Sequence, residues 1–324
     1  MQYIPYDELN DQPNVIVDGA ANAYTLMTLS HWPSNHTPRN LKDDLSAQIV
    51  FHYLDKPEMH VATDIVSNNH FDQDGLVGIY CLLHPSAAQS QRSLLIDIAA
   101  AGDFATYRLR DAARCTFALA AFADPDLSPL DPKIFRERYP TMAARLYEEI
   151  LPRFPEMVNH TERFQSYWEH EDAMLEESEA MIRNGAIQIQ EISELDLAVV
   201  TLPESLAGRK VHRFTSNRNA ACHPMALHNV IRSFRVLLIQ GRSYELQYRY
   251  ESWVQYISRK PLPRIDLSAL AEEFSAMEHG TARWKFDGID EITPKLALSG
   301  TEESQIPPET FRCRVEEFLR MTAS

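Results

Sequence analysis

The sequence predicts an α/β protein, in which an amino-terminal domain built on a parallel sheet is followed by a smaller α/β domain with a mixed sheet. Two observations carry this prediction. Up to Asp103, short apolar runs that read as strands alternate with segments of helical spacing, the order that produces parallel sheets with right-handed crossovers. After Gly185 strand-like runs dominate, and two of them flank Gln240-Gly241-Arg242 as in a β-hairpin.

Composition points to a soluble globular protein. The chain has 324 residues, of which 44% are hydrophobic and 24% charged, enough for two domains. No apolar stretch approaches the roughly 20 residues that a membrane helix needs, and the first residues lack the basic and apolar regions of a signal peptide. The four cysteines are far apart, as in reduced compartments. We therefore expect a cytoplasmic protein with no membrane partner, and a homodimer is one possible assembly.

Charge and glycine content narrow the function classes. The formal net charge of −15 argues against a protein that binds duplex nucleic acid, because phosphate neutralisation needs a basic face. Only ten glycines are present, and neither a P-loop nor a dinucleotide-binding fingerprint occurs. These observations argue against a Walker-type ATPase and a standard Rossmann dehydrogenase.

Three apolar runs in the amino-terminal part read as buried strands, at residues 14–17, 60–67 and 93–97. Helical spacing predicts helices between them, at 41–54 and 76–83. In a parallel sheet the carboxyl ends of the strands lie along one edge, where open α/β folds bind ligands. Side chains that follow these strands are therefore the first candidates for a site.

The segment Asn68 to Gly75, Asn-Asn-His-Phe-Asp-Gln-Asp-Gly, directly follows the second predicted strand. His70, Asp72 and Asp74 occupy alternate positions, so an extended segment would point them the same way. Imidazole and carboxylate together suit Mg²⁺ or Mn²⁺. The alternative is a polar surface turn in which Asp and Asn cap the next helix.

Acidic residues also follow the other two predicted strands. Asp18 ends the first, Asp97 ends the third, and Asp103 lies shortly after. We expect these side chains to meet the 68–75 loop at one sheet edge. For each one alone, capping a turn or the following helix is the alternative. The candidate metal ligands are thus Asp18, His70, Asp72, Asp74, Asp97 and Asp103.

The remaining elements define the domain organisation. Helical spacing predicts helices at 104–123, 135–151 and 158–184, and Gly185 is a helix stop. Beyond it the sequence predicts strands at 187–191, 195–202, 211–214, 235–239 and 243–252 and helices at 223–232, 265–277 and 308–321. We place the amino-terminal domain at 1–157, a helical connector at 158–185 and the second domain at 186–324.

The segment from Ile65 to Gly78, Ile-Val-Ser-Asn-Asn-His-Phe-Asp-Gln-Asp-Gly-Leu-Val-Gly, resembles the first motif of the DHH phosphoesterase superfamily. That motif is an apolar strand, a loop with Asp-x-Asp-Gly or Asp-x-Asp-Ala, and a helix of small residues. The superfamily includes RecJ-like exonucleases, oligoribonucleases, cyclic-dinucleotide phosphodiesterases and family II inorganic pyrophosphatases. Segments 249–252, 264–274 and 277–280 are similar to its associated substrate-binding domain.

The resemblance implies a phosphoesterase that uses one or two Mn²⁺ or Mg²⁺ ions to activate water. Its substrate would be a small phosphate ester, a nucleotide or a short oligonucleotide, and Asp72 or Asp74 would bridge the ions. No Asp-His-His triplet occurs, so Asp18 and His31 are the proposed replacements for its ligands. His31 or His70 is alternatively a proton donor to the leaving oxygen.

The resemblance also assigns the second domain to substrate binding. Arg249 would hold the substrate phosphate in a bidentate fashion, together with His279 and Gly280. The alternatives are a surface ion pair for Arg249 and a turn position for His279. Because the triplet is missing, the competing hypothesis is a catalytically silent relative that binds a metal or nucleotide as a regulatory module.

Overall fold

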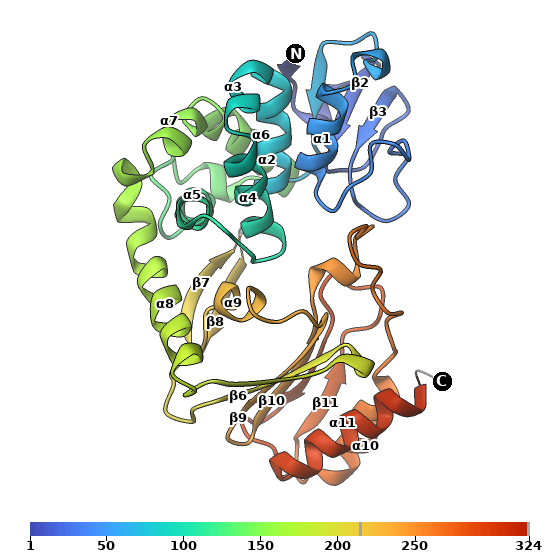
Figure 1. The fold of residues 1–324 in the computed structure, drawn as a ribbon, viewed down its shortest axis with the longest axis vertical. Helices are drawn as coiled ribbons and strands as arrows, with labels where there is room; N and C mark the ends of the chain where they lie inside the picture. The colour runs from blue at the N-terminus through green and yellow to red at the C-terminus, as the bar shows by residue number, and fades with distance from the viewer. Residues whose placement is uncertain (214–215, 323–324) are drawn as a thin grey trace. The chain divides into compact units, whose positions relative to one another are not determined.

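The computed structural model describes residues 1–213 and 216–322 and divides into two compact units, drawn in Figure 1. Unit 1 comprises Met1–Leu175, Arg209–Ala220 and Val254–Arg259. Unit 2 comprises Glu176–Gly208, Ala221–Trp253 and Lys260–Ser324. These bounds describe packing, and the functional division into 1–157, 158–185 and 186–324 stays a prediction.

Unit 1 contains a four-stranded sheet in the order β1-β4-β2-β3. Each neighbouring pair is parallel, which confirms the parallel sheet predicted for this part of the chain. The valine and isoleucine side chains of β2 are fully buried, as expected for an inner strand covered on both faces. The strands are β1 (Gln2–Tyr3), β2 (Asn14–Val17), β3 (Thr25–Leu29) and β4 (Ile65–Ser67).

Helices of unit 1 pack on this sheet and on one another (Figure 1). Helix α2 (Gln73–Leu83) begins at an N-cap, because the Asp72 carboxylate accepts a hydrogen bond from the Gly75 amide at 2.8 Å. A Cβ added at Gly78 would lie 2.5 Å from Val17 Cγ1, so this glycine lets α2 approach β2 closely. The other helices around it are α1 (Ser46–Leu54), α3 (Pro85–Ser90), α4 (Arg92–Asp103) and α5 (Arg110–Phe122).

Several element predictions in unit 1 need correction, including the helices predicted at 104–123 and 158–184, which begin at Arg110 and Gln165. The strand predicted at 93–97 is wrong, because these residues form part of helix α4. Leu95, Ile98 and Gly102 are buried at helical spacing, so the apolar run continues as one helical face. The strand predicted at 60–67 is confined to Ile65–Ser67, and the helix predicted at 41–54 begins only at Ser46.

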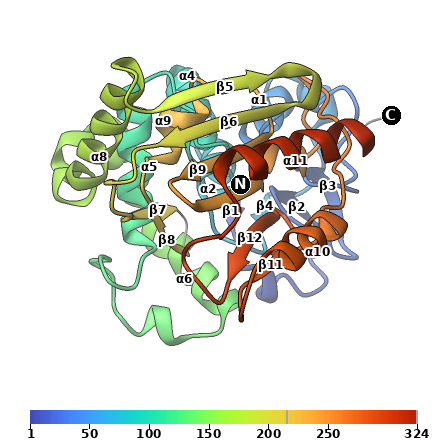
Figure 2. The same ribbon diagram turned by 90° about the horizontal axis from the view of Figure 1, so that it is seen from below.

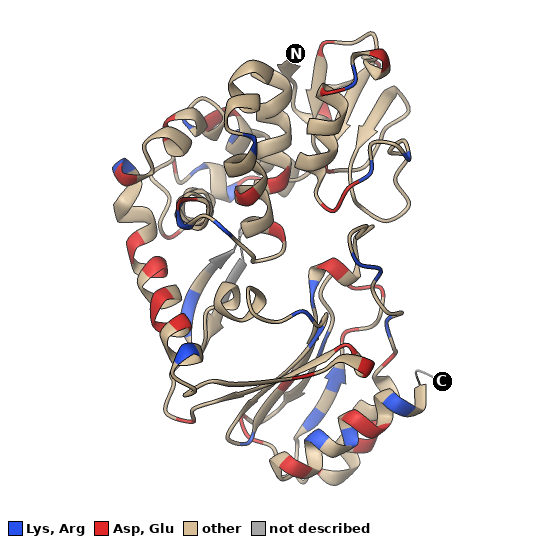
Figure 3. Cartoon of the chain, viewed as in Figure 1, with Lys and Arg blue, Asp and Glu red and all other residues tan. Residues whose placement is uncertain are grey.

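The rest of unit 1 is largely helical. Acidic residues, red in Figure 3, recur along α8 (Gln165–Arg183), which continues into unit 2. Asp172 of this helix pairs with Arg110 at 2.5 Å and with Arg114 at 3.1 Å. No helix among the described residues is both long and apolar enough to cross a membrane. The remaining elements are α6 (Tyr139–Ile150), α7 (Phe154–Asn159) and an antiparallel hairpin of β7 (Arg209–Arg213) and β8 (Ser216–Ala220). A strand was predicted at 211–214, and its last residue, Phe214, lies outside the described residues.

Unit 2 is built on a six-stranded mixed sheet in the order β11-β12-β10-β9-β6-β5. Only β6 and β9 pair in parallel, and β9 and β10 form the predicted hairpin. Helices α10 and α11 cover one face of this sheet (Figure 2). The hydrophobic core that the sheet and the helices share includes Leu237, Phe274 and Phe311. The elements are β5 (Gln188–Ile192), β6 (Leu197–Leu202), α9 (Pro224–His228), β9 (Arg235–Gln240), β10 (Ser243–Tyr248), α10 (Ser268–Met277), β11 (Arg283–Phe286), β12 (Lys295–Ser299) and α11 (Pro308–Thr322).

Candidate metal centre

Three strand ends of the parallel sheet bring imidazole and carboxylate groups together. Asp18 directly follows β2, His31 lies two residues after β3, and His70 lies in the loop after β4. Because β2 pairs with both β3 and β4, the two histidines approach Asp18 from opposite sides of its strand. Asp18 has a φ of 49°, in the left-handed region that aspartate tolerates better than most residues. The sheet edge expected from the sequence therefore carries the cluster.

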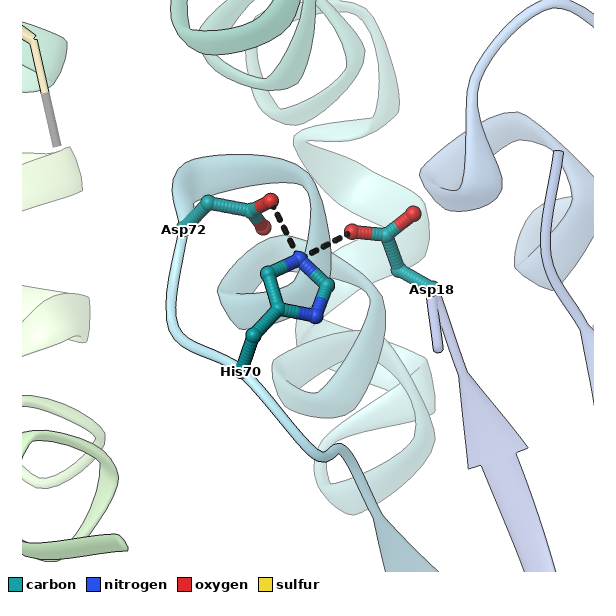
Figure 4. A group of neighbouring side chains, drawn as sticks. All are labelled: Asp18, His70 and Asp72. Carbon is teal, nitrogen blue, oxygen red and sulfur yellow. Dashed lines mark hydrogen bonds and ion pairs between the residues drawn. The ribbon is translucent and has the colours of Figure 1, made fainter. Parts of the chain in front are cut away.

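The two carboxylate oxygens of Asp18 face different imidazoles. Asp18 Oδ1 lies 3.4 Å from His31 Nε2 and accepts a hydrogen bond from Ser46 Oγ at 2.7 Å. Asp18 Oδ2 lies 3.3 Å from His70 Nε2, as Figure 4 shows, but no hydrogen bond among the described residues reaches it. The Asp18 side chain is fully buried. The Asp18 carboxylate therefore lies between two groups of potential metal ligands.

Asp44 determines which ring nitrogen of His31 carries a proton. His31 Nδ1 lies 2.5 Å from the carbonyl oxygen of Asp44. A carbonyl oxygen only accepts, so Nδ1 must donate, and the neutral ring then carries its lone pair on Nε2. That nitrogen faces Asp103 Oδ2 at 3.3 Å and Asp74 Oδ2 at 3.8 Å, besides Asp18. This is the orientation of a metal-ligating histidine held by an outer carbonyl.

Backbone amides at two helix N-termini hold Asp72, the N-cap of α2, and Asp74, which lies in the first turn of α2 rather than in an extended segment. The oxygens of Asp74 accept hydrogen bonds from the amides of Ser46 and Ala47, both at 2.7 Å, where α1 begins. Asp72 caps α2 through Oδ1, which leaves Oδ2 at 2.6 Å from His70 Nε2. The capping alternative and the ligand hypothesis for these residues are therefore compatible. A single carboxylate can accept hydrogen bonds at a helix N-terminus and also bind a metal ion.

The cluster contains two groups of three potential ligands that share Asp18. One is Asp18, His31 and Asp74, and the other is Asp18, His70 and Asp72; within each group the ligand atoms lie within 4.8 Å of one another. Two ligand atoms that bind one ion at about 2.1 Å lie roughly 3.0–3.4 Å apart at octahedral or tetrahedral angles. The separations of 3.3 and 3.4 Å between Asp18 and the two histidines match this spacing.

Burial perturbs the acid–base properties of the cluster. Burial, with the charges of Asp18 and Asp72, raises the pKa of Asp74 well above its usual range. Burial also raises the pKa of Asp72, with the charge of His70 opposing it. For Asp18, burial is outweighed by the contacts with His70 and the charge of His31, which lower its pKa to about 2. Burial would lower the pKa of His70, but Asp72 and Asp18 raise it well above the usual value.

Without a cation the cluster is short of positive charge. Among the described residues, Asp18, Asp72 and Asp74 form ion pairs only with His31 and His70, and with no lysine or arginine. Buried carboxylates that lack such partners remain protonated or bind a metal. Carboxylate oxygens and two imidazoles form a donor set that could hold a metal ion, and Asp18 Oδ2 offers a buried acceptor without a hydrogen bond.

Of the other two candidate ligands, only Asp103 reaches the cluster. Asp103, at the end of α4, places Oδ2 3.3 Å from His31 Nε2. Asp97 lies within the same helix, and its carboxylate accepts hydrogen bonds from the amides of Arg108 at 2.9 Å and Leu109 at 2.7 Å. The prediction that Asp97 ends a strand at the sheet edge is wrong, and its carboxylate holds the loop before α5 instead.

The three residues predicted to bind substrate all lie in unit 2. Arg249 is 5% exposed; its Nη1 donates to the carbonyl of Ile231 at 3.0 Å, and its Nε and Nη2 donate to Glu251. These are contacts of a structural ion pair, not of a guanidinium that offers a fork to a ligand. His279 and Gly280 are exposed in the turn after α10, where Gly280 has a φ of 67°.

Two residues of the site were missed by the sequence analysis. Ser46 contacts Asp18 through its hydroxyl and Asp74 through its amide. Asp44 holds His31 through its backbone carbonyl. The sequence carries no pattern that would single out either one, because a backbone carbonyl has no side-chain signature. The only sequence feature that pointed to this region was the helix predicted at 41–54.

Comparison with known proteins gives a family but no activity. The model of a family of unknown function, DUF6687, matches residues 1–324, so the chain belongs to that family. Neither a search of curated proteins nor a search of solved structures found a match.

Proposed function

We propose that this member of the DUF6687 family is a metal-dependent phosphoesterase that hydrolyses a small phosphate ester, a nucleotide or a short oligonucleotide. The observation that carries the proposal is the shared carboxylate of Asp18, whose two oxygens face His31 at 3.4 Å and His70 at 3.3 Å. Two-ion hydrolytic sites hold their ions about 3.5–4 Å apart, and a carboxylate between two ligand groups can offer one oxygen to each ion. The resemblance of the 65–78 segment, which contains His70, Asp72 and Asp74, to the DHH superfamily also supports the proposal.

When bound in these two groups, Mn²⁺ or Mg²⁺ would activate water for attack on phosphorus and neutralise the charge that develops on the phosphoryl oxygens. Asp18 would bridge the two positions, which revises the expectation that Asp72 or Asp74 does so. His31 and Asp74 would supply the inner position, and His70 and Asp72 the outer one. Asp103, 3.3 Å from His31 Nε2, would complete the inner position.

The two positions differ in their access to solvent. The side chains of Asp18, His31 and Asp74 are 0% exposed, whereas His70 is 16% and Asp72 10% exposed. Substrate would therefore approach from the His70 and Asp72 side. His70 Nε2 lies 2.6 Å from Asp72 Oδ2 and, with its raised pKa, holds a proton in the metal-free protein. That proton is available to a leaving oxygen if His70 does not bind an ion.

A catalytically silent metal-binding module is the second candidate, and the contacts of Arg249 favour it. The arginine expected to hold a substrate phosphate is bonded to Glu251 and Ile231 instead. A protein of this kind would bind the ions without turning over phosphate esters.

Phosphate-ester hydrolysis with defined metals separates these candidates. Metal-depleted protein would be assayed with bis-p-nitrophenyl phosphate and a panel of nucleotides and short oligonucleotides, with Mn²⁺, with Mg²⁺ and with chelator. We expect hydrolysis that depends on the metal and is lost in Asp18→Asn but kept in Asp97→Asn. Metal binding without hydrolysis of any substrate would favour the silent module. Absence of metal binding would contradict both candidates.

A further inference from the structure

One segment from the second half of the chain packs into unit 1 beside the metal centre. Residues Val254–Arg259, here called the strap, belong to unit 1, although the residues on either side, Trp253 and Lys260, belong to unit 2. No pattern in the sequence marks the strap, and its contacts concentrate on His31 and on the residues that hold it.

The strap binds the backbone of His31 directly. The amide of Gln255 donates to the carbonyl oxygen of His31 at 2.7 Å. The side-chain oxygen of Gln255 in turn accepts a hydrogen bond from Lys42 Nζ at 2.7 Å. This pair of contacts fixes the strap at one end beside the histidine.

The strap also binds the residue that sets the His31 tautomer. The Asp44 carboxylate accepts hydrogen bonds from the amides of Ile257 at 2.6 Å and Ser258 at 2.9 Å, and a third from the Ser258 hydroxyl. The backbone carbonyl of the same Asp44 accepts from His31 Nδ1. One residue, 9% exposed, therefore connects the strap to the imidazole.

The strap makes a third contact with Phe104, the residue that follows helix α4. The ring of Tyr256 meets that of Phe104 edge to face, with centroids 5.5 Å apart and an angle of 74°. Phe104 follows Asp103, and its ring centroid is 6.1 Å from that of His31. The strap thus reaches the histidine through its backbone, through its hydrogen-bond partner and through a neighbouring ring.

We propose that the strap is a positioning element of the metal centre, in which Asp44 holds the His31 ring so that Nε2 presents its lone pair to the ion. The inference rests on the proposed metal centre. The strap tethers Asp44 by three hydrogen bonds to its carboxylate, while the backbone carbonyl of Asp44 contacts His31 Nδ1. Outer partners of this kind typically change metal affinity by roughly 10- to 100-fold. Asp44 and Ser258 would act through His31.

Two variants loosen this connection and two matched variants leave it intact. Asp44→Asn introduces an amide group opposite the strap amides, and Ser258→Ala removes only the hydroxyl contact. Ile257→Ala is the control on the strap itself, since that side chain is 53% exposed. Asp64→Asn is the control for loss of an exposed aspartate in unit 1.

The first readout is the tautomer of His31 in the metal-free protein. NMR that resolves the two ring nitrogens would be recorded at about pH 8.5, where an ordinary imidazole is neutral, with His31→Gln identifying the signals. We expect wild type and both controls to hold the proton on Nδ1. Asp44→Asn, and Ser258→Ala to a smaller degree, should populate the other tautomer. A strap that only contributes packing would lower the melting temperature without changing the tautomer.

The second readout is Mn²⁺ affinity, measured by the electron paramagnetic resonance signal of the free ion. We expect Asp44→Asn to weaken binding about tenfold and the controls to bind as wild type does. An unchanged tautomer in both Asp44→Asn and Ser258→Ala would overturn the proposal. If wild type binds no Mn²⁺, the proposed function fails, yet the tautomer still decides the role of the strap.

Discussion

Asp18 is the residue on which both ligand groups depend, because it is the only member they share. Replacing it with asparagine removes one charged oxygen and puts a donor amide between His31 and His70. We expect Asp18→Asn to lower the affinity for both ions by more than about 100-fold, beyond the effect typical of outer partners. Elemental analysis after dialysis against Mn²⁺ measures this directly.

Asp97→Asn is the matched control for that experiment, because both residues are buried aspartates at positions first chosen as ligands. Its carboxylate accepts three amide hydrogen bonds from Arg108 and Leu109. We expect unchanged metal content and a loss of stability of about 1–3 kcal/mol. Loss of metal in Asp97→Asn, with metal retained in Asp18→Asn, would show that the site has been placed wrongly.

The buried charges of the cluster predict how stability depends on pH. His70 has a raised pKa, so its contribution is complete below the ordinary histidine value and is lost as the pH rises through the folded-state value. Asp74, also raised, holds a proton that the unfolded chain releases, so it too favours the folded state less as the pH rises. The metal-free protein should therefore become less stable as the pH rises, from about pH 4 through Asp74 and from about pH 6.5 through His70.

A bound cation replaces these protons, so its stabilising effect should grow over the same range of pH. Thermal unfolding would be followed with Mg²⁺ and with chelator at several pH values from about 6.5 upward. We expect the difference in melting temperature between the two series to increase with pH. Parallel curves would mean that the cation does not displace protons from His70 and Asp74.

Most residues of the site were predicted because a strand end marked them. Asp18, His70, Asp72 and Asp74 were chosen this way and His31 was chosen by resemblance, and the structure brings all five together. Arg249 was chosen by resemblance, and its partner Glu251 could be seen only in the fold. Ser46 and Asp44 act partly through backbone groups, which leave no trace in the pattern of side chains.

At the level of elements, the contact between α2 and β2 positions Asp18. An added Cβ at Gly78 would meet Val17 Cγ1 at 2.5 Å and Val50 Cγ2 at 3.3 Å. Alanine is the better helix former by about 1 kcal/mol, but its added methyl group would press on Val17, the residue that precedes Asp18. We expect Gly78→Ala to destabilise the protein by about 1–3 kcal/mol and to weaken metal binding.

Chemical denaturation and Mn²⁺ titration of Gly78→Ala measure the two effects together. The double variant with Val17→Ala makes room for the new methyl group, so it should recover much of the metal affinity. A double variant as weak in binding as Gly78→Ala would place the cause elsewhere than in this contact.

Elements were predicted well where a periodic pattern had a single interpretation. The strand at 14–17 and the hairpin around Gly241 lie where the pattern placed them. The run at 93–97 failed because a short apolar segment is compatible with a buried strand and with a buried helix. The Ala-rich residues that follow it continue the helical spacing, and they are the signal that should have decided the matter.

For the whole molecule, the structure predicts that metal binding acts on one unit. Amides of Ser46, Ala47 and Gly75 in unit 1 donate directly to the carboxylates of the cluster. The core of unit 2, with Leu237 and Phe274, is separate. We expect Mg²⁺ to slow hydrogen exchange at these unit 1 amides and to leave the unit 2 core unchanged, as measured by mass spectrometry. Equal protection of both units would contradict this expectation.

The sequence predicts only part of the division into two units. The change of character at Gly185 is visible as a change of periodicity. The return of Arg209–Ala220 and Val254–Arg259 to unit 1 is not, because nothing local in a segment reports which core it joins. The strap is one of these returning segments, so its contacts with Asp44 and His31 could come only from the fold.

The central claim is that Asp18 bridges two cation positions at the carboxyl edge of the parallel sheet. Anomalous scattering from a crystal of the full chain soaked in Mn²⁺ tests it most directly. We predict two peaks, one within about 2.0–2.6 Å of Asp18, His31 and Asp74, and the other within the same range of Asp18, His70 and Asp72. A crystal that shows no peak at this cluster, or peaks that do not share Asp18, would contradict the claim.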